Sequence, residues 1–158
     1  MYRSIFDLDG TVIDSTHRHA TLPDGSLDLA HWIENSTPEK IAGDSLLPLA
    51  NYMRMFFPHH EVLVCTARVM GEADYDFLFD NGLQADAILS RPEGNHLPDG
   101  YLKEMLLRDH ATRRGLTWVE FVKNTTIFDD NASVLETLGR VGIRTICART
   151  LNRVLAED

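Results

Sequence analysis

The chain has 158 residues and a formal net charge of −9, with 44% hydrophobic and 25% charged residues. This length suits one domain with a sizeable core, and the ordinary composition excludes a disordered chain, a collagen-like repeat and a coiled coil. The acidic balance argues against a protein that coats long stretches of nucleic acid, because such binding needs clustered Lys and Arg. An acidic protein can still bind a single phosphate group.

Short apolar runs alternate with helical patterns along most of the chain. The runs expected as strands are residues 2–8, 62–65, 87–89, 126–128 and 143–147. The first, second and fifth runs are nearly continuous in apolar residues, as strands covered on both faces should be. Helical spacing is expected over residues 41–57, around 77–78, over 100–114 and over 134–141. This alternation predicts one α/β domain over residues 1–158, a doubly wound (Rossmann-like) parallel sheet with helices on both faces.

The cysteines and the hydropathy suggest where the protein works. Cys65 and Cys147 each lie in an apolar run, which indicates buried free thiols in a reducing compartment. The sequence has no apolar run that could cross a membrane, and Asp7 comes too early for a signal peptide. We therefore expect a cytoplasmic protein with no membrane partner.

Residues 14–40 do not follow the alternation of strands and helices. They are rich in His, Pro, Gly, Asp and Ser, and they follow the first predicted strand, where α/β sheets present their active sites. Trp32 is expected to anchor this segment. With His17, Arg18 and His19, it should face the leaving group of a substrate. A zinc site among the histidines is rejected, because no i, i+4 pair or Cys supports it.

Polar residues follow three of the predicted strands. These residues are Asp7, Asp9, Gly10 and Thr11 after the first, Thr66 and Arg68 after the second, and Asp129, Asp130 and Asn131 after the fourth. They should converge, because the carboxyl ends of parallel strands meet at one edge of the sheet. Clustered carboxylates without a counter-charge are costly, and ligands that are all oxygen point to Mg²⁺. Lys103, near the start of a predicted helix, should lie close to something anionic.

Four motifs occur in a fixed order. They are Asp7-x-Asp9-Gly10-Thr11, Thr66 after a hydrophobic strand, Lys103 on a later helix, and Asp129-Asp130 after another strand. In this order the sequence resembles the haloacid-dehalogenase-like (HAD-like) phosphohydrolases over nearly its whole length. Residues 91–103 are also similar to the stretch before the motif Lys in phosphatase domains of polynucleotide kinase-phosphatases. This superfamily usually seals its site with a larger cap. Residues 14–40 would be a rudimentary cap, so the site would be open to a large substrate or covered by a neighbouring subunit.

These residue types suit the hydrolysis of phosphate monoesters. Asp7 would attack phosphorus and form an aspartyl-phosphate, while Asp9 would protonate the leaving oxygen and later activate water. Thr66 and Lys103 would contact the other phosphoryl oxygens. The expected metal ligands are Asp7, Asp9 through its carbonyl, Asp129 and Asp130. The expected substrate-binding residues are Gly10, Thr11, Arg68 and Arg91.

Several of these residues also have structural interpretations. Asn131 is expected to cap a helix, and Asp130 is equally a cap or a metal ligand. Thr11 could be a capping hydroxyl. Arg68 and Arg91 could be solvated surface arginines.

A nucleotide is the expected substrate, either a nucleoside monophosphate or a 3′-phosphorylated nucleic-acid end. The likeness of residues 91–103 favours the nucleic-acid end, whereas the charge of −9 and the lack of a Walker-type kinase motif favour a free nucleotide. A phosphatase of a non-nucleotide metabolite is one alternative. A receiver-like phospho-accepting domain is another, but such domains carry the acidic pair after the first strand and the accepting Asp after the third.

Overall fold

A five-stranded parallel sheet forms the centre of the computed structural model, which describes residues 1–157. Its strands are β1 (Arg3–Phe6), β4 (Glu61–Thr66), β5 (Ala87–Ser90), β6 (Thr125–Asp129) and β7 (Arg144–Cys147), in the order β5-β4-β1-β6-β7. The expected doubly wound α/β sheet is confirmed. From β1 the chain builds outward first through β4 and β5 and then through β6 and β7. The carboxyl end of β1 is therefore the point where the topology switches, the usual place for a ligand.

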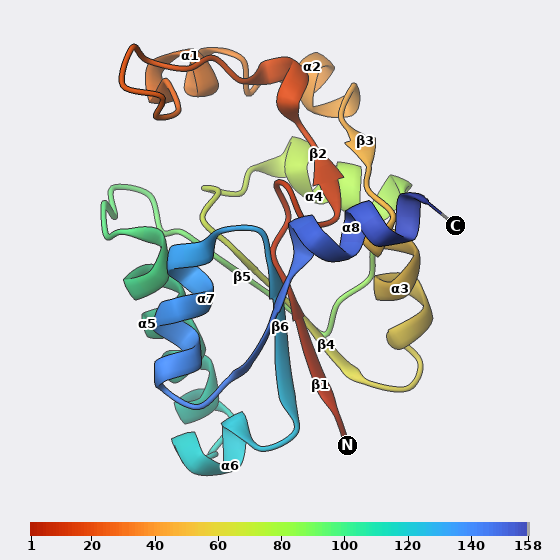
Figure 1. Ribbon diagram of the computed structural model, residues 1–158, viewed down its shortest axis with the longest axis vertical. Helices are drawn as coiled ribbons and strands as arrows, with labels where there is room; N and C mark the ends of the chain where they lie inside the picture. Colours follow the sequence, from red (N-terminus) through yellow and green to blue (C-terminus); the bar gives the residue numbers. More distant parts are fainter. Residues whose placement is uncertain (158) are drawn as a thin grey trace.

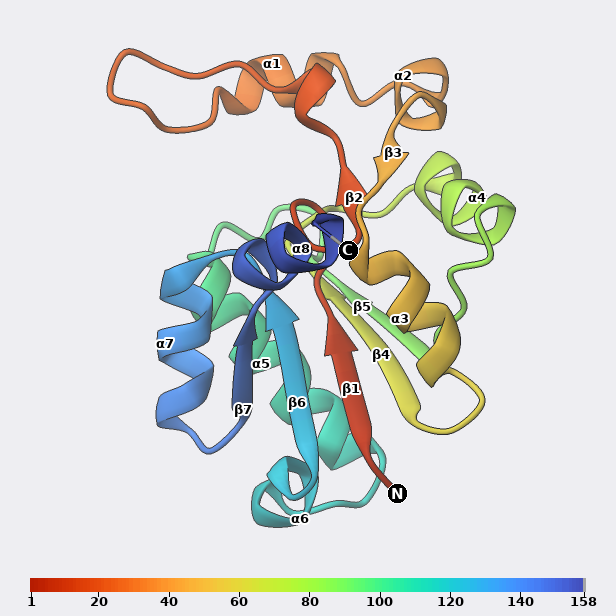
Figure 2. The same cartoon turned by 45° about the vertical axis from the view of Figure 1, so that its right-hand side comes forward.

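Helices cover both faces of this sheet (Figures 1 and 2). One face carries α3 (Leu49–Phe56), α4 (Glu72–Asp80) and α8 (Ala148–Ala156), and the other carries α5 (Asp99–Arg113), α6 (Trp118–Val122) and α7 (Ala132–Arg140). Successive residues of the strands alternate between the two cores, since Phe6 and Val64 pack on the first and Ile5 and Leu63 on the second. None of the helices described for residues 1–157 combines the length and hydrophobicity that a membrane span requires.

The fifth predicted strand is covered less than expected. As β7 it lies at the edge of the sheet, and its residues are half-buried or exposed. Cys147 is accordingly exposed, so the prediction that it is buried is wrong, whereas Cys65 is buried as expected. Both cysteines are free thiols.

The segment after β1 forms a small cap at the carboxyl edge of the sheet (Figure 1). Its first and last strands, β2 (Ile13–Asp14) and β3 (Ser45–Leu46), pair antiparallel. Between them lie η1 (Thr16–Arg18), α1 (Leu29–Glu34) and α2 (Pro38–Ala42). Because β3 closes the segment, it runs to Asp44 rather than ending at Lys40. Contacts between α2 and α4 fix it to the core, where Ile41 is buried.

The helix expected over residues 41–57 is interrupted. Gly43 is the C-cap of α2, and the short strand β3 follows it. Pro48 then precedes α3, which covers only Leu49–Phe56. Pairing of β3 with β2 breaks the apolar spacing that a sequence pattern reads as one helix.

Close packing of α5 on α7 depends on Gly100. A Cβ atom at this position would lie 2.6 Å from Thr137 Oγ1 and 3.0 Å from Thr137 Cβ. Lys103 lies on the next turn of α5, so the same contact sets its distance from the sheet.

We predict that Gly100→Ala lowers the melting temperature by thermal denaturation. Overpacking of this kind costs about 1–3 kcal/mol, more than the gain in helix propensity of about 1 kcal/mol. The double variant Gly100→Ala/Thr137→Ala should recover part of the loss. Gly139→Ala is the matched control, because its Cβ would meet Thr145 Cγ2 at an ordinary 3.7 Å. Equal melting temperatures for Gly100→Ala and Gly139→Ala would contradict this account.

Candidate active site

Lys103 joins two acidic residues at the carboxyl ends of neighbouring strands. Asp7 follows β1, Asp129 ends β6, and both side chains are buried. The Lys103 ammonium is 2% exposed and donates to Asp7 Oδ1 at 2.9 Å and to Asp129 Oδ2 at 2.6 Å. Burial disfavours the ammonium, but the charges of Asp7 and Asp129 raise the pKa of Lys103 above its ordinary value. Lys103 is therefore a buried cation at the expected anionic site rather than a surface lysine.

Three carboxylates at this edge are arranged as a metal site. Asp7, Asp129 and Asp130 each offer an oxygen within 4.8 Å of the others. Burial and the charge of Asp7 raise the pKa of Asp129 to about 6, although Lys103 opposes this, and raise the pKa of Asp130 to about 7. Mutual repulsion of this kind is relieved by a bound cation, and oxygen ligands suit a hard divalent ion. The donor set fits Mg²⁺.

A tight turn after β1 brings Asp130 and Asp7 together. Gly10 has a φ of +77°, and a Cβ atom there would lie 2.2 Å from Asp130 Oδ2. Glycine is therefore needed both for the backbone conformation and for the approach of Asp130. The buried Thr11 donates from its hydroxyl to Asp7 Oδ2 at 3.3 Å, so it helps to fix the orientation of the Asp7 carboxylate.

Thr66 ends β4 beside this cluster of side chains. Its side chain is buried, and Oγ1 accepts a hydrogen bond from the Arg68 backbone N–H at 3.0 Å. A hydroxyl that accepts in this way still has its own hydrogen to donate. Thr66 can therefore offer an O–H to a phosphoryl oxygen.

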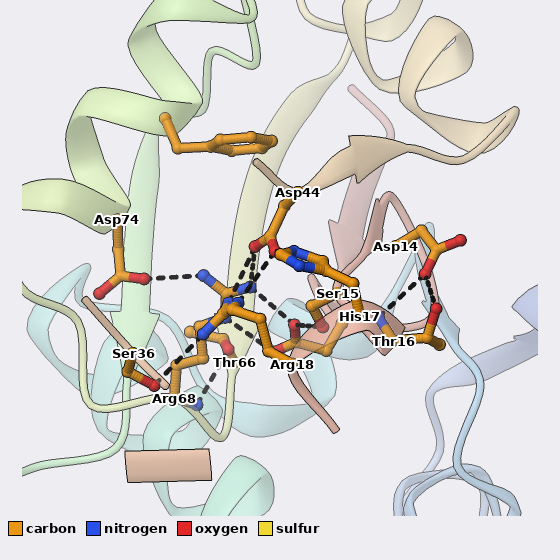
Figure 3. Close-up of polar contacts among 12 residues, drawn as sticks. Asp14, Ser15, Thr16, His17, Arg18, Ser36, Asp44, Thr66, Arg68 and Asp74 are labelled. Atoms are coloured by element: carbon orange, nitrogen blue, oxygen red, sulfur yellow. Dashed lines mark hydrogen bonds and ion pairs between the residues drawn. The ribbon is translucent and has the colours of Figure 1, made fainter. Parts of the chain in front are cut away.

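Arg68 is buried and contacts three carboxylates (Figure 3). Its Nε and Nη2 donate to Asp9 Oδ2 and Oδ1 at 2.8 and 2.7 Å, a bidentate pair. Nη1 donates to Asp74 at 2.7 Å and Nη2 to Asp44 at 3.3 Å. The interpretation of Arg68 as a solvated surface residue is wrong. In this arrangement its guanidinium pairs with Asp9, and its predicted contact with a substrate stays a prediction.

The carboxyl group of Asp9 is hydrogen-bonded from two sides. Its Oδ1 also accepts a hydrogen bond from the buried Ser15 hydroxyl at 2.6 Å. Burial alone would raise the pKa of Asp9, but Arg68 and Ser15 together lower it below the ordinary value. Of its two oxygens, Oδ1 takes both Ser15 and Arg68, whereas Oδ2 takes only Arg68.

Arg91 ties the loop before α5 to the core. It donates from Nε to the Ala67 carbonyl, from Nη1 to the Leu97 carbonyl and from Nη2 to Asp99, each at 2.9 Å. These bonds join the loops that follow β4 and β5 and fix the start of α5, the helix that carries Lys103. Arg91 is thus not a freely solvated arginine, and its role toward a substrate stays a prediction.

Two further residues have structural roles at the edge of the site. Asn131 caps α7, as expected, and accepts from the Ser133 N–H at 2.9 Å. Asn152 of α8 was missed from the sequence. It donates to the Thr11 carbonyl and accepts from the Leu49 N–H, both at 2.9 Å, and so ties the turn after Asp7 to α3. A polar residue amid the apolar positions of α8 was the available signal.

The cap residues expected to face a leaving group form contacts among themselves. Arg18 is 1% exposed and lies with its Cζ 4.2 Å from the Trp32 ring centre, which confirms Trp32 as an anchor. His19 packs edge-on against Trp32 and contacts Ser15 Oγ at 3.2 Å. His17 contacts Asp44, another residue missed from the sequence.

Comparison with known proteins places the chain in a family. Residues 2–157 match the family described as bacteriophage T5 5′-deoxynucleotidase. The 5′-deoxynucleotidase of Escherichia phage T5 is 30% identical over 168 aligned residues, which cover 96% of this chain and 69% of that protein.

Solved structures share the fold. The HAD-like hydrolase SP0104 of Streptococcus pneumoniae has a TM-score of 0.64 at 13% identity, over 97% of this chain and 91% of that one. A chain of the Pnkp1/Rnl/Hen1 complex has a TM-score of 0.63 at 18% identity, and the match covers 94% of this chain but 45% of that one. An enzyme of Bacteroides thetaiotaomicron, solved with magnesium and inorganic phosphate, has a TM-score of 0.51 at 10% identity, over 93% of both chains.

The family match spans nearly all the described residues, and the fold is that of the HAD-like hydrolases. The enzyme class expected from the motifs, a phosphoric monoester hydrolase, is confirmed. The chain belongs to the bacteriophage T5 5′-deoxynucleotidase family.

Proposed function

We propose that the protein is a Mg²⁺-dependent phosphatase of deoxynucleoside 5′-monophosphates that works through an aspartyl-phosphate on Asp7. The observation that carries this proposal is the Lys103 ammonium bonded to both Asp7 and Asp129, with Asp130 completing a set of divalent-cation ligands. Mg²⁺ held by these carboxylates and the Asp9 carbonyl would neutralise charge on the phosphoryl oxygens. The name of the phage T5 relative supports the choice of substrate.

The protein's own side chains account for the remaining chemistry. An Asp7 carboxylate oxygen attacks phosphorus while the bond between phosphorus and the ribose oxygen breaks. Asp9, in its protonated form, gives its proton to that oxygen and becomes the carboxylate that Arg68 and Ser15 stabilise. This carboxylate then takes a proton from the water that releases phosphate. We assign this proton to Asp9 Oδ2, because Oδ2 accepts one hydrogen bond, from Arg68, whereas Oδ1 accepts two, from Ser15 and Arg68. Lys103 and the Thr66 hydroxyl hold the other phosphoryl oxygens.

The charges around the site favour a substrate with one phosphate. Arg18, Arg68, Arg91 and Lys103 each form an ion pair with at least one carboxylate. The backbone phosphates of a nucleic-acid end need further cations. We therefore choose a free mononucleotide over a 3′-phosphorylated end.

Substrate choice is tested with a matched panel of 5′-deoxymononucleotides, 3′-mononucleotides and 3′-phosphorylated oligonucleotides. We expect the 5′-deoxymononucleotides to have the highest kcat/KM by about tenfold or more, which corresponds to about 1.4 kcal/mol in the transition state. Phosphate release is measured with Mg²⁺ present. Faster hydrolysis of the phosphorylated oligonucleotides would overturn the choice of substrate and leave the phosphatase chemistry in place.

We predict that Asp7→Asn removes turnover and leaves the fold intact. The amide nearly preserves the shape of the side chain but cannot act as the nucleophile. Steady-state assays should show a loss well above about tenfold, with circular dichroism unchanged. Activity retained within about tenfold, which is about 1.4 kcal/mol, would refute the covalent mechanism.

A further prediction concerns Asp130 and the metal. The pKa of Asp130 is about 7 in the folded protein, whereas an aspartate carboxyl in the unfolded chain has a pKa near 4. Between these two pH values the folded state keeps a proton that the unfolded chain has lost. The associated stability is present below about pH 4 and is lost as the pH rises through about 7. At about pH 8 without metal, Asp130→Asn should therefore have a higher melting temperature than the wild type.

Mg²⁺ should raise the wild-type melting temperature more than that of the Asp130→Asn variant, and chelation should abolish activity. Full activity in excess chelator would contradict the metal assignment.

A further inference from the structure

Asp44 is a buried carboxylate at the base of the cap, directly before β3. Its side chain is fully shielded from solvent. Oδ1 accepts from His17 Nε2 at 2.7 Å and from Arg18 Nε at 2.9 Å, and Oδ2 accepts from Arg18 Nη2 at 2.8 Å and Arg68 Nη2 at 3.3 Å (Figure 3). Arg18 belongs to the cap and Arg68 to the loop after β4. Asp44 therefore joins a cation of the cap to a cation of the core.

The position of Arg68 is set from three directions. Asp74 at the start of α4 binds Nη1, Asp44 binds Nη2, and Asp9 binds Nε and Nη2. A bidentate arginine–carboxylate pair requires the two planar groups to face each other. The rotation of the Arg68 plane therefore decides where the Asp9 carboxylate points.

We propose that Asp44 is a positioning residue: by holding Arg68 Nη2 it keeps the Arg68 guanidinium on Asp9, and so couples the cap to the group that protonates the leaving oxygen. This inference rests on the proposed function. Without Asp44, the ion pairs left to Arg68 are those with Asp74 and Asp9, and its plane can turn about the axis between them. Asp9 turns with it.

A purely structural role explains this arrangement less well. Buried ion pairs add little net stability over well-packed apolar groups, because burying their charges is costly. The cap is in any case attached to the core through α2, whose Ile41 packs in the core with residues of α4. What the Asp44 contacts add to that attachment is a defined orientation for Arg68.

The role of Asp44 is tested by comparing two leaving groups. p-Nitrophenolate leaves readily without a proton, whereas the ribose oxygen of a deoxynucleoside 5′-monophosphate needs one. In Asp44→Asn we expect the ratio of kcat/KM for the nucleotide over kcat/KM for p-nitrophenyl phosphate to fall by about tenfold or more, since small misplacements of a catalytic group cost up to about 10²-fold. The comparison uses kcat/KM because it reports phosphoryl transfer to Asp7 and excludes the later attack of water, which both substrates share. Asp24→Asn, an exposed aspartate in the same cap, is the matched control and should leave the ratio unchanged.

A double-mutant cycle shows whether Asp44 acts through Arg68. In an Arg68→Lys background the bidentate pair is already lost, so Asp44→Asn should not lower the ratio further. A ratio that falls equally in both backgrounds overturns the proposal. So does an Asp44→Asn variant that loses the same factor on both substrates, because reduced folding affects them alike.

The remaining outcomes are also decisive. If Asp44→Asn does not fold, the ratio is measured in Asp44→Glu, which keeps the charge but displaces the oxygens. An unchanged ratio in that variant overturns the role of Asp44. If the wild-type enzyme hydrolyses both substrates and the Asp44 variants have the same ratio as the wild type, this inference is refuted and the proposed function is not. A wild-type enzyme with no phosphatase activity refutes the proposed function as well.

Discussion

The buried ammonium of Lys103 between Asp7 and Asp129 is the interaction on which the site depends. These residues come from distant parts of the chain, and only the parallel sheet and the packing of α5 bring them together. An ammonium without partners at this depth would be costly, and so would the two carboxylates. The attraction between Lys103 and the two carboxylates therefore offsets the cost of burying all three charges. The packing of Gly100 against α7 and the bonds of Arg91 to the start of α5 also position Lys103, since both fix the helix that carries it.

A second group of charged residues, around Arg18 and Arg68, lies beside the group around Lys103. The two groups differ in the balance between carboxylates and cations. Around Lys103 the carboxylates outnumber the cation, which leaves room for a divalent metal. In contrast, the guanidinium groups of Arg68 and Arg18 are each paired with carboxylates of the protein itself. The two carboxylates of the Asp7-x-Asp9 motif fall on opposite sides of this division. Asp7 lies with the carboxylates that could hold a metal ion, and Asp9 lies with the arginines, so two aspartates of one short motif have different environments.

Much of this site follows from local sequence rules. The apolar runs before Asp7, Thr66 and Asp129 are correct strands because a buried parallel strand needs continuous apolar character, and the polar residue after it must lie at the carboxyl edge. The rules fail where a distant contact decides the outcome. The helical spacing of residues 41–57 is overridden by the pairing of β3 with β2, and Cys147 is exposed because β7 has only one neighbouring strand. Asp44 and Arg18 resemble ordinary loop residues, since their burial depends on partners far along the chain.

The pairing of β2 with β3 also bears on how this enzyme could diversify. Ile13 lies opposite Leu46, and Asp14 opposite Ser45, so the chain leaves the core and returns to it at neighbouring points. The entropy of closing a loop grows only with the logarithm of its length, by about 0.6 kcal/mol for each doubling. The segment between these strands can therefore be lengthened, shortened or exchanged at a small cost in the free energy of folding of the sheet. Natural variation and directed evolution can act on the parts of this segment that do not contact Asp9 or Arg68, while the geometry around Asp7 stays the same.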